Sequence, residues 1–323
     1  LFPGEYAGKG IGMIPRHFWP FGLLALGLAA APLAARAQDT AGAGAPSAVP
    51  GWAELVETLR DLPDRMLARL PEDMRADPQV RQEVARLALA ALSSSALEAL
   101  GGDGDAPQFL PVLGQIFKVG QPTADTVYRA ATIAPGGTYR LRGKRGSVNH
   151  AIIAQFLPPG AQGDGGRPHL DLSTLKRDAA GRFDVLISPQ RPQAHEGDWW
   201  QPHPAANRLM IRMVSSDWAG EEEPTLAIER VDRPATRPRP PAAALEARLR
   251  SLPKAVDFIA LMFVGHHEKL RQDGLINAVR SYDVGMGALD TQFYYEGAYD
   301  LAEDEALIVE SDVPESCRYR SLI

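Results

Sequence analysis

Short runs of β-branched and aromatic residues, separated by turn signals, fill most of the chain after Pro122. Pro135-Gly136-Gly137 and Pro158-Pro159-Gly160 are two of these turn signals, and each lies between two such runs. Short strands at this spacing are typical of an all-β sandwich or barrel. We therefore expect residues 121–323 to be mainly β with helical additions, folded as an antiparallel, jelly-roll-like β-sandwich. The expected strands cover residues 126–133, 138–142, 148–156, 183–188, 209–215, 226–231, 292–299, 306–310 and 318–323.

Residues 51–120 carry a different pattern, in which apolar residues recur at helical spacing. Asp77 followed by Pro78 is a good helix start, because Asp can cap the first turn and Pro is tolerated there. Gly101-Gly102 is a natural stop for the same helix. We expect a helical lead-in over this range, which packs on the next domain and does not fold alone.

A second helical stripe covers residues 241–272, after a proline-rich connector at residues 233–241. Apolar residues there alternate steps of three and four, which is a helical period. We expect an interruption near Pro253, because proline removes a helical hydrogen bond. The second half, with Phe258 and Met262, is apolar nearly all round and is expected to be buried. This segment is therefore predicted to be a helical insertion within the sandwich.

Residues 13–37 have the composition of a secretory signal peptide. Arg16 and His17 precede an apolar run at residues 18–34, and the run ends in Ala35-Arg36-Ala37. A basic start, a short apolar run and an A-x-A site together define such a peptide. Prolines interrupt the run, and it is shorter than the roughly 20 apolar residues of a membrane-spanning helix. The sequence therefore predicts a periplasmic or secreted protein.

We expect residues 1–37 to be upstream residues plus the signal peptide, and residues 38–50 to be a flexible linker rich in Ala, Gly and Pro. The mature chain is expected to contain no membrane span. Because the sequence stops at Ile323, inside an expected strand, we also expect the sandwich to be truncated at its C-terminal side. An open sheet edge invites pairing with another chain, so a homo-oligomer remains an open alternative.

The charge balance of the chain is acidic. The formal net charge is −6, and removing residues 1–37 takes it to −8, because Lys9, Arg16 and Arg36 outnumber Glu5 by two. A basic face is what nucleic acids and anionic membrane surfaces require, so we expect neither as a partner. The single cysteine of the chain excludes an internal disulfide and a cysteine-based zinc site.

Three blocks of sequence form a recognisable set. The blocks are Asp125-Thr126-Val127-Tyr128-Arg129-Ala130 with Thr138-Tyr139-Arg140-Leu141, Arg208-Leu209-Met210-Ile211-Arg212 with Ser216-Asp217-Trp218, and Asp304-Glu305-Ala306-Leu307 with Cys317-Arg318-Tyr319. Taken together and in order, they resemble the bacterial proteins that carry the domain of unknown function numbered twelve-fourteen, and the likeness spans roughly residues 50–323. The resemblance implies jelly-roll-like β-sandwich domains with helical additions, and no agreed activity. The chain departs from such proteins at Thr123-Ala124, where Asn-Pro is frequent, and at Arg320, where an aromatic residue is usual.

The richest polar cluster contains His195, Asp198 and His203, with Trp199 and Trp200 between them. Histidines and carboxylates so close together could hold a divalent metal, and the paired indoles could stack on a sugar ring. The spacing matches none of the tight zinc signatures, and the surrounding Pro and Gly residues indicate an irregular loop. A structural loop with an aromatic anchor is therefore the favoured interpretation, and a metal or ligand site is the alternative.

Asp125, Tyr128 and Arg129 lie where the chain enters its first expected strand. Strand alternation places Tyr128 and Arg129 on opposite faces. A structural Asp–Arg pair is the simpler interpretation of this group. As a binding site, Arg129 together with Arg140 or Arg142 could recognise a carboxylate or a sulfate.

The sequence contains no serine-hydrolase elbow, phosphate loop or dinucleotide fingerprint, so no cofactor other than a divalent metal is indicated. Two hypotheses follow. The first is an exported, envelope-side β-sandwich protein that binds a small molecule or glycan, or has a structural role. The second is an exported hydrolase or lyase that acts on a carbohydrate or a lipid-like acid, with or without a metal. The second requires the polar cluster to form a cleft with the residues of the first strand.

Overall fold

The structure is a computed structural model that describes residues 49–114, 117–118, 123–158, 161, 169–234, 239–282, 292–312 and 315–322. Residues Pro46–Ile323 belong to one compact unit. The expected signal peptide, and the expected linker up to residue 48, lie outside the described residues.

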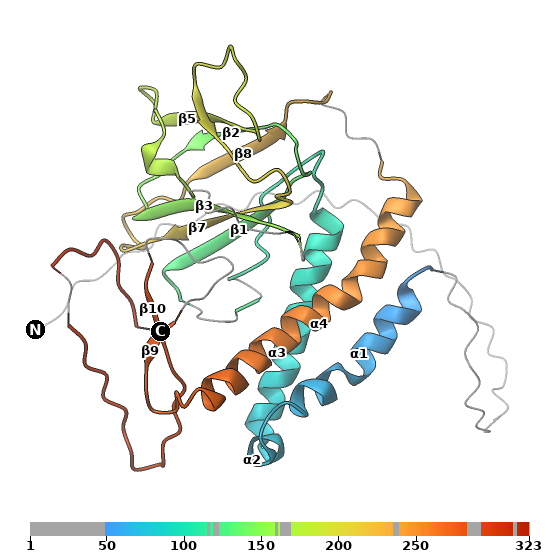
Figure 1. Ribbon diagram of the computed structural model, residues 1–323, viewed down its shortest axis with the longest axis vertical. Coiled ribbons are helices and arrows are strands. Elements are labelled where there is room, and N and C mark those ends of the chain that lie inside the picture. The colour runs from blue at the N-terminus through green and yellow to red at the C-terminus, as the bar shows by residue number, and fades with distance from the viewer. Residues whose placement is uncertain are drawn as a thin grey trace, which may run out of the picture. The chain divides into compact units, whose positions relative to one another are not determined.

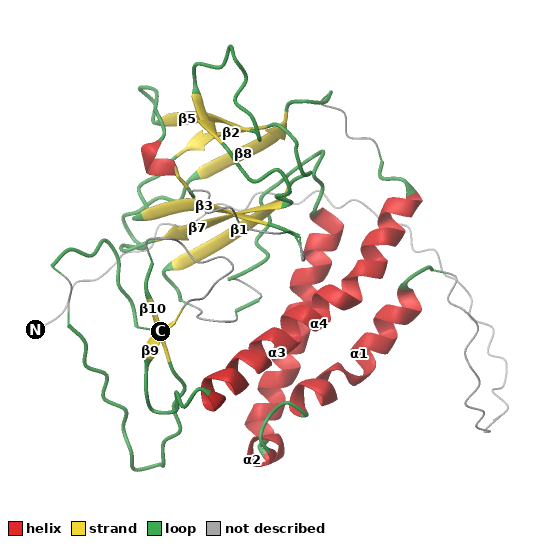
Figure 2. Ribbon diagram, viewed as in Figure 1, coloured by secondary structure: helices red, strands yellow, loops and turns green. Residues whose placement is uncertain are grey.

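Two four-stranded sheets, here named sheet A and sheet B, form a β-sandwich (Figures 1 and 2). Paired strands run antiparallel, as expected, except β5 and β6, which are parallel. Sheet A has the order β1 (Thr126–Thr132), β7 (Arg208–Val214), β3 (His150–Phe156) and β4 (Leu170–Asp171), with a 3-10 turn at Leu172–Thr174. Sheet B has the order β6 (Asp198–Trp200), β5 (Arg182–Ile187), β2 (Tyr139–Lys144) and β8 (Thr225–Arg230).

One hydrophobic core fills the space between the two sheets. Every second side chain of a strand points to the same face, and the inward positions here are apolar. Ile153 and Ile211 of sheet A and Leu141 and Val185 of sheet B are all completely buried in this core. Burial of such side chains is the main stabilising contribution to a fold of this kind. The mainly β sandwich predicted from the short β-branched and aromatic runs is therefore confirmed.

The six strands expected between residues 126 and 231 are present, each within two residues of its predicted limits. Residues 292–299 contain only β10 (Tyr294–Glu296), which pairs with β9 (Arg280–Tyr282). The strands expected at residues 306–310 and 318–323 are wrong, because the described residues there form no strand. Strand-like composition does not make a strand unless a neighbouring backbone offers hydrogen-bond partners.

The expected helical lead-in consists of α1 (Trp52–Leu67), the short α2 (Glu72–Ala76) and α3 (Pro78–Gly101). Asp77 caps α3 as predicted, because its carboxylate accepts a hydrogen bond from the backbone N–H of Gln79 at 2.7 Å. The helix ends at Gly101, which also agrees with the prediction.

The expected insertion helix is α4 (Ala242–Gln272), and it continues through Pro253, so the predicted interruption is wrong. Proline cannot donate the helical hydrogen bond to Leu249, yet its ring is buried, and packing keeps the helix continuous. Phe258 and Met262 are 56% and 41% exposed. The prediction that this half of the helix is wholly buried is therefore also wrong.

The helices α1, α3 and α4 pack around a second hydrophobic core of their own (Figure 2). Met66, Ala91 and Val256, one from each helix, are completely buried in it. Arg65 of α1 donates two hydrogen bonds to Asp257 of α4, at 2.9 and 2.7 Å. The lead-in thus packs with the insertion helix of the domain that follows it, and Glu98 of α3 also lies 3.4 Å from Arg208 of β7 in the sandwich. By length and apolar composition alone, α3 could also cross a membrane.

The segment that follows α3 joins the helical core to the sandwich. Tyr139 of β2 is 1% exposed, and its hydroxyl donates to the carbonyl oxygen of Gly104 at 2.7 Å and accepts from the N–H of Ala134 at 2.6 Å. The guanidinium of Arg230 lies 5.8 Å from the centroid of the Tyr139 ring and pairs with Asp105. Burial raises the pKa of Tyr139, which keeps the phenol neutral and able to donate.

Candidate functional site

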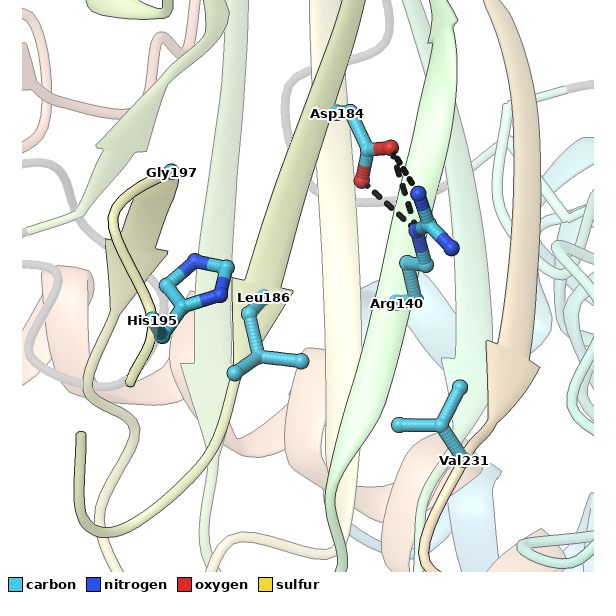
Figure 3. A pocket seen from close by; sticks show the side chains of 6 residues that line it. All are labelled: Arg140, Asp184, Leu186, His195, Gly197 and Val231. Atoms are coloured by element: carbon cyan, nitrogen blue, oxygen red, sulfur yellow. Dashed lines mark hydrogen bonds and ion pairs between the residues drawn. The ribbon is translucent and has the colours of Figure 1, made fainter. Parts of the chain in front are cut away.

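A shallow hollow of about 520 Å³ lies on the outer face of sheet B (Figure 3). Arg140 of β2 and two residues of β5 line it, together with two residues of the loop between β5 and β6. Val231, which directly follows β8, also lines it. The hollow is lined by Arg140, Asp184, Leu186, His195, Gly197 and Val231.

Strand register decides which side chains face the hollow. Leu186 of β5 is paired with Arg140 of β2 on one side and with Trp199 of β6 on the other. Arg140 is paired in turn with Glu229 of β8. Cross-strand partners point to the same face of a sheet. One row of side chains therefore crosses all four strands on the outer face of sheet B, with an apolar side chain next to an aromatic one.

Arg140 and Asp184 form a two-pronged ion pair in the wall of the hollow. The Nε atom of Arg140 donates to both carboxylate oxygens of Asp184, at 2.9 and 3.1 Å, and Nη2 donates to Oδ2. The hydrogen bond from Arg140 lowers the pKa of Asp184, and the same bond raises the pKa of Arg140. Both groups are therefore charged at neutral pH, and their charges cancel. Each is nearly half exposed, so the pair adds little stability, but it fixes donors and acceptors in place.

His195 forms the opposite wall and is held by its own loop. Its Nε2 lies 2.9 Å from the carbonyl oxygen of Asp198. A carbonyl only accepts, so Nε2 donates, and Nδ1 of the neutral ring is an acceptor. Arg191 donates to the carbonyl oxygens of His195 and Gly197, both at 3.3 Å. A Cβ atom at Gly197 would lie 3.1 Å from the imidazole, so a side chain there would crowd the ring. Figure 3 shows the imidazole turned towards Leu186.

This arrangement suits a neutral ligand that has both apolar and polar surfaces. Leu186 and Val231 offer apolar area, and Val231 is 43% exposed. Arg140, Asp184 and His195 offer hydrogen-bond donors and acceptors around that area. Because the ion pair is internally neutralised, the hollow offers an ion little electrostatic attraction. Sugars and other polyols combine C–H surface with hydroxyl groups that both donate and accept, which matches this lining.

Residues 198–200, expected to lie in an irregular loop, form β6, so that part of the prediction is wrong. Trp200 is 6% exposed within the sandwich core and is not available to stack on a ligand. Trp199 lies on the outer face beside Leu186, and its indole N–H donates to the hydroxyl of Ser188 at 3.0 Å. Only one of the two expected stacking residues is therefore placed near the hollow.

The three expected metal candidates do not form one cluster. The carboxylate of Asp198 accepts from the backbone N–H of Lys176 at 2.6 Å, and His195 is bonded to the Asp198 carbonyl. Nδ1 of His203 accepts from the backbone N–H of Ala205 at 3.0 Å. Among the residues that the structure describes, no group of three or more His, Cys, Asp and Glu side chains is placed to hold a metal ion.

The residues at the start of β1 do not line the hollow. Arg129 pairs with Glu223 at 2.6 Å and not with Asp125, so the expected Asp–Arg pair is wrong. The carboxylate of Asp125 instead accepts from the indole N–H of Trp218 at 3.0 Å and from the hydroxyl of Tyr319 at 2.6 Å. Arg129 and Asp125 therefore contact the acidic turn after β7, and Asp125 also contacts the C-terminal segment.

Tyr128 lies on the outer face of sheet A, directly opposite Arg212 of β7. The guanidinium of Arg212 is 5.3 Å from the centroid of the Tyr128 ring, and burial raises the pKa of Tyr128. The expected anion site of neighbouring arginines is not assembled. Arg140 is bound to a carboxylate in the hollow, and Arg142 pairs with Glu229 at 2.8 Å.

Asp184, Leu186 and Val231 line the hollow but carry no recognisable motif. The usable signal is Leu186, which occupies an outward position of its strand, where alternation predicts a polar residue. An apolar residue at an outward position marks either a covered face or a binding surface. The sequence pattern does not give the pairing register of β2 and β5, which places Leu186 beside Arg140.

No family of known proteins matches the chain, and no curated protein is significantly similar to it. Among solved structures, an uncharacterised protein from Burkholderia cenocepacia is 25% identical, with a TM-score of 0.69 over 79% of this chain and 70% of that one. A second, a protein of Vibrio parahaemolyticus, is 21% identical over 35% of this chain and 32% of that one; its TM-score of 0.28 carries no argument. The resemblance to the domain of unknown function stays a prediction. What the first likeness shows is a shared fold.

Proposed function

We propose that the chain is an exported, envelope-side β-sandwich protein that binds a neutral carbohydrate in the hollow on sheet B. The observation that carries the proposal is the pairing of apolar Leu186 and Val231 with the internally neutralised Arg140–Asp184 pair in one open hollow. Trp199, beside Leu186 in the same row, extends the apolar surface on which a sugar ring can pack.

The test is titration calorimetry with soluble oligosaccharides of glucose and of N-acetylglucosamine. Wild-type protein is expected to bind at least one of them at millimolar or tighter affinity. Asp184→Asn keeps the size of the side chain but removes its charge and therefore the ion pair with Arg140. Because a hydrogen bond to a charged group contributes about 1.5–3 kcal/mol, the variant is expected to bind roughly tenfold or more weakly.

Glu223→Gln is the matched control for this experiment. Glu223 also pairs with an arginine of a strand, Arg129 of β1, its exposure is nearly the same as that of Asp184, and it does not line the hollow. This variant is expected to bind like wild type. An absence of binding to every oligosaccharide, or an equal loss in the two variants, would contradict the proposal.

The export part of the proposal rests on residues 13–37 and has its own test. The chain from Met13 onward, expressed in a Gram-negative host, is expected to reach the periplasm or the medium. Cleavage after Ala37 would give a mature N-terminus at Gln38, which N-terminal sequencing can identify. Recovery of uncleaved protein from the cytoplasm alone would contradict export.

A further inference from the structure

A second polar cluster lies on the outer face of sheet A, beneath the C-terminal segment. Arg212 of β7 is paired with Ile152 of β3, and His150 of β3 is paired with the residue two positions after Arg212. The two polar side chains are therefore diagonal neighbours on one face. The ring of Tyr319 covers His150 edge-on, with centroids 6.5 Å apart and planes at 86°. Arg212 also donates to the hydroxyl of Tyr294 at 3.1 Å, and Figure 1 shows β10 beside this sheet.

Positive charges outnumber negative charges around His150. Arg145 is 7% exposed, and its guanidinium donates to the carbonyl oxygens of the loop before β3. Arg318 donates to the backbone of that loop at 2.9 Å and lies 3.6 Å from the carboxylate of Asp171. Of the charged groups with the largest effects on His150, three are the arginines Arg145, Arg212 and Arg318, and one is the carboxylate of Asp171. The local field favours an anion.

The imidazole of His150 has an unused hydrogen-bonding atom. Its Nδ1 is buried and has no hydrogen-bond partner among the described residues. Burial, followed by the charge of Arg318, lowers the pKa of His150, so the ring is neutral at neutral pH. A buried polar atom without a partner costs free energy, and in a native protein it calls for an explanation such as a bound water or ligand. An acceptor atom at this position would remove that cost.

We propose that this cluster, named here the His150 site and defined by His150, Arg212 and Arg318, binds a small oxyanion group, namely a carboxylate, a phosphate or a sulfate. An oxygen of the anion accepts from the Nδ1–H tautomer of His150. The side chain of Arg318, which is 51% exposed, supplies a charge-assisted hydrogen bond, and Arg212 supplies charge. Because Tyr319 covers the imidazole, binding requires the C-terminal segment to shift. This site differs from the carbohydrate hollow in its face of the sandwich and in the charge of its ligand.

The test is thermal unfolding of the full chain in sodium phosphate, compared with sodium chloride at the same ionic strength. The wild-type protein is expected to show a saturable rise of Tm in phosphate only. Arg318→Gln is expected to weaken phosphate binding about tenfold, because it removes a charge-assisted hydrogen bond. Arg320→Gln is the control, since Arg320 is an exposed arginine of the same segment that bonds to Ser311. It is expected to leave phosphate binding unchanged.

His150→Phe gives a second, independent variant, because it removes the ring nitrogens and keeps an aromatic ring against Tyr319. It is expected to abolish the saturable rise, with folding checked by circular dichroism. Parallel titrations with acetate and sulfate decide which oxyanion group the site prefers. The proposal is overturned by an equal Tm rise in phosphate and chloride, by equal losses in Arg318→Gln and Arg320→Gln, or by a saturable rise that survives His150→Phe.

Discussion

Single buried polar groups connect the two halves of this molecule, and Tyr139 is the clearest example. Its hydroxyl satisfies Gly104 on the helical side and Ala134 on the sandwich side. Tyr139→Phe leaves both partners without their bond, so the free energy of unfolding is expected to fall by about 1–3 kcal/mol in urea titrations. Tyr295→Phe is the control, because Tyr295 is 69% exposed. An equal effect of both substitutions would contradict this role of Tyr139.

A half-buried histidine on α4 makes stability depend on pH. Burial, and then the charge of Arg271, lowers the pKa of His267 below its ordinary value of 6.5. The unfolded chain therefore binds more protons than the folded chain just below pH 6.5, and stability decreases as the pH falls through that range. His267→Gln is expected to reduce this decrease between about pH 6.5 and pH 5, measured by urea unfolding. Asp184, whose pKa is lowered, affects stability only at more acidic pH, so its contribution can be separated from that of His267. An unchanged pH dependence in the variant would refute the role of His267.

At the scale of elements, the start of α3 is set by one side chain. Asp77 satisfies a backbone N–H that the first turn cannot bond internally. Asp77→Ala is expected to lower the free energy of unfolding by about 1 kcal/mol. Asp73→Ala, in the first turn of α2, removes an acidic side chain without removing a cap and is expected to change stability by less than about 0.5 kcal/mol. Chemical denaturation of both variants measures the difference, and similar losses would contradict the capping role.

The elements that could be predicted are those whose signal is local. Asp77-Pro78 and Gly101 mark the ends of α3, and short runs of β-branched and aromatic residues mark six of the eight strands up to β8. The parallel strand β6 was not predictable, because Asp198–Trp200 is only three residues long and becomes a strand through its pairing with β5. Residues 306–310 have strand composition without a strand. Continuity of α4 through Pro253 likewise depends on packing with the other helices, which a local pattern does not contain.

The site was predictable only in part, because it depends on tertiary register across the whole sandwich. His195 was recognised because it belongs to a polar cluster in the sequence. Asp184 and Leu186, in contrast, belong to the hollow only because β5 lies between β2 and β6. The residues that carry the resemblance meet elsewhere. Asp125 of the first block contacts Trp218 of the second and Tyr319 of the third. That convergence lies at sheet A, whereas the hollow lies on the outer face of sheet B.

The residues that the structure describes form two hydrophobic cores, one between the sheets and one among the helices. Because the contacts between the two parts include isolated polar links such as that of Tyr139, we expect the cores to unfold in separate steps. Leu62, 1% exposed, belongs to the helical core, and Leu141, completely buried, belongs to the sandwich. Each change to Ala is expected to cost about 2–5 kcal/mol in its own core. In a background in which Phe replaces every tryptophan except Trp200, Leu62→Ala should lower the unfolding midpoint seen by helical circular dichroism while the fluorescence transition of Trp200 stays in place, and Leu141→Ala should do the reverse. If both signals move together in both variants, the helices and the sandwich unfold as one cooperative unit. The contacts between the two parts would then couple their stabilities more strongly than we expect.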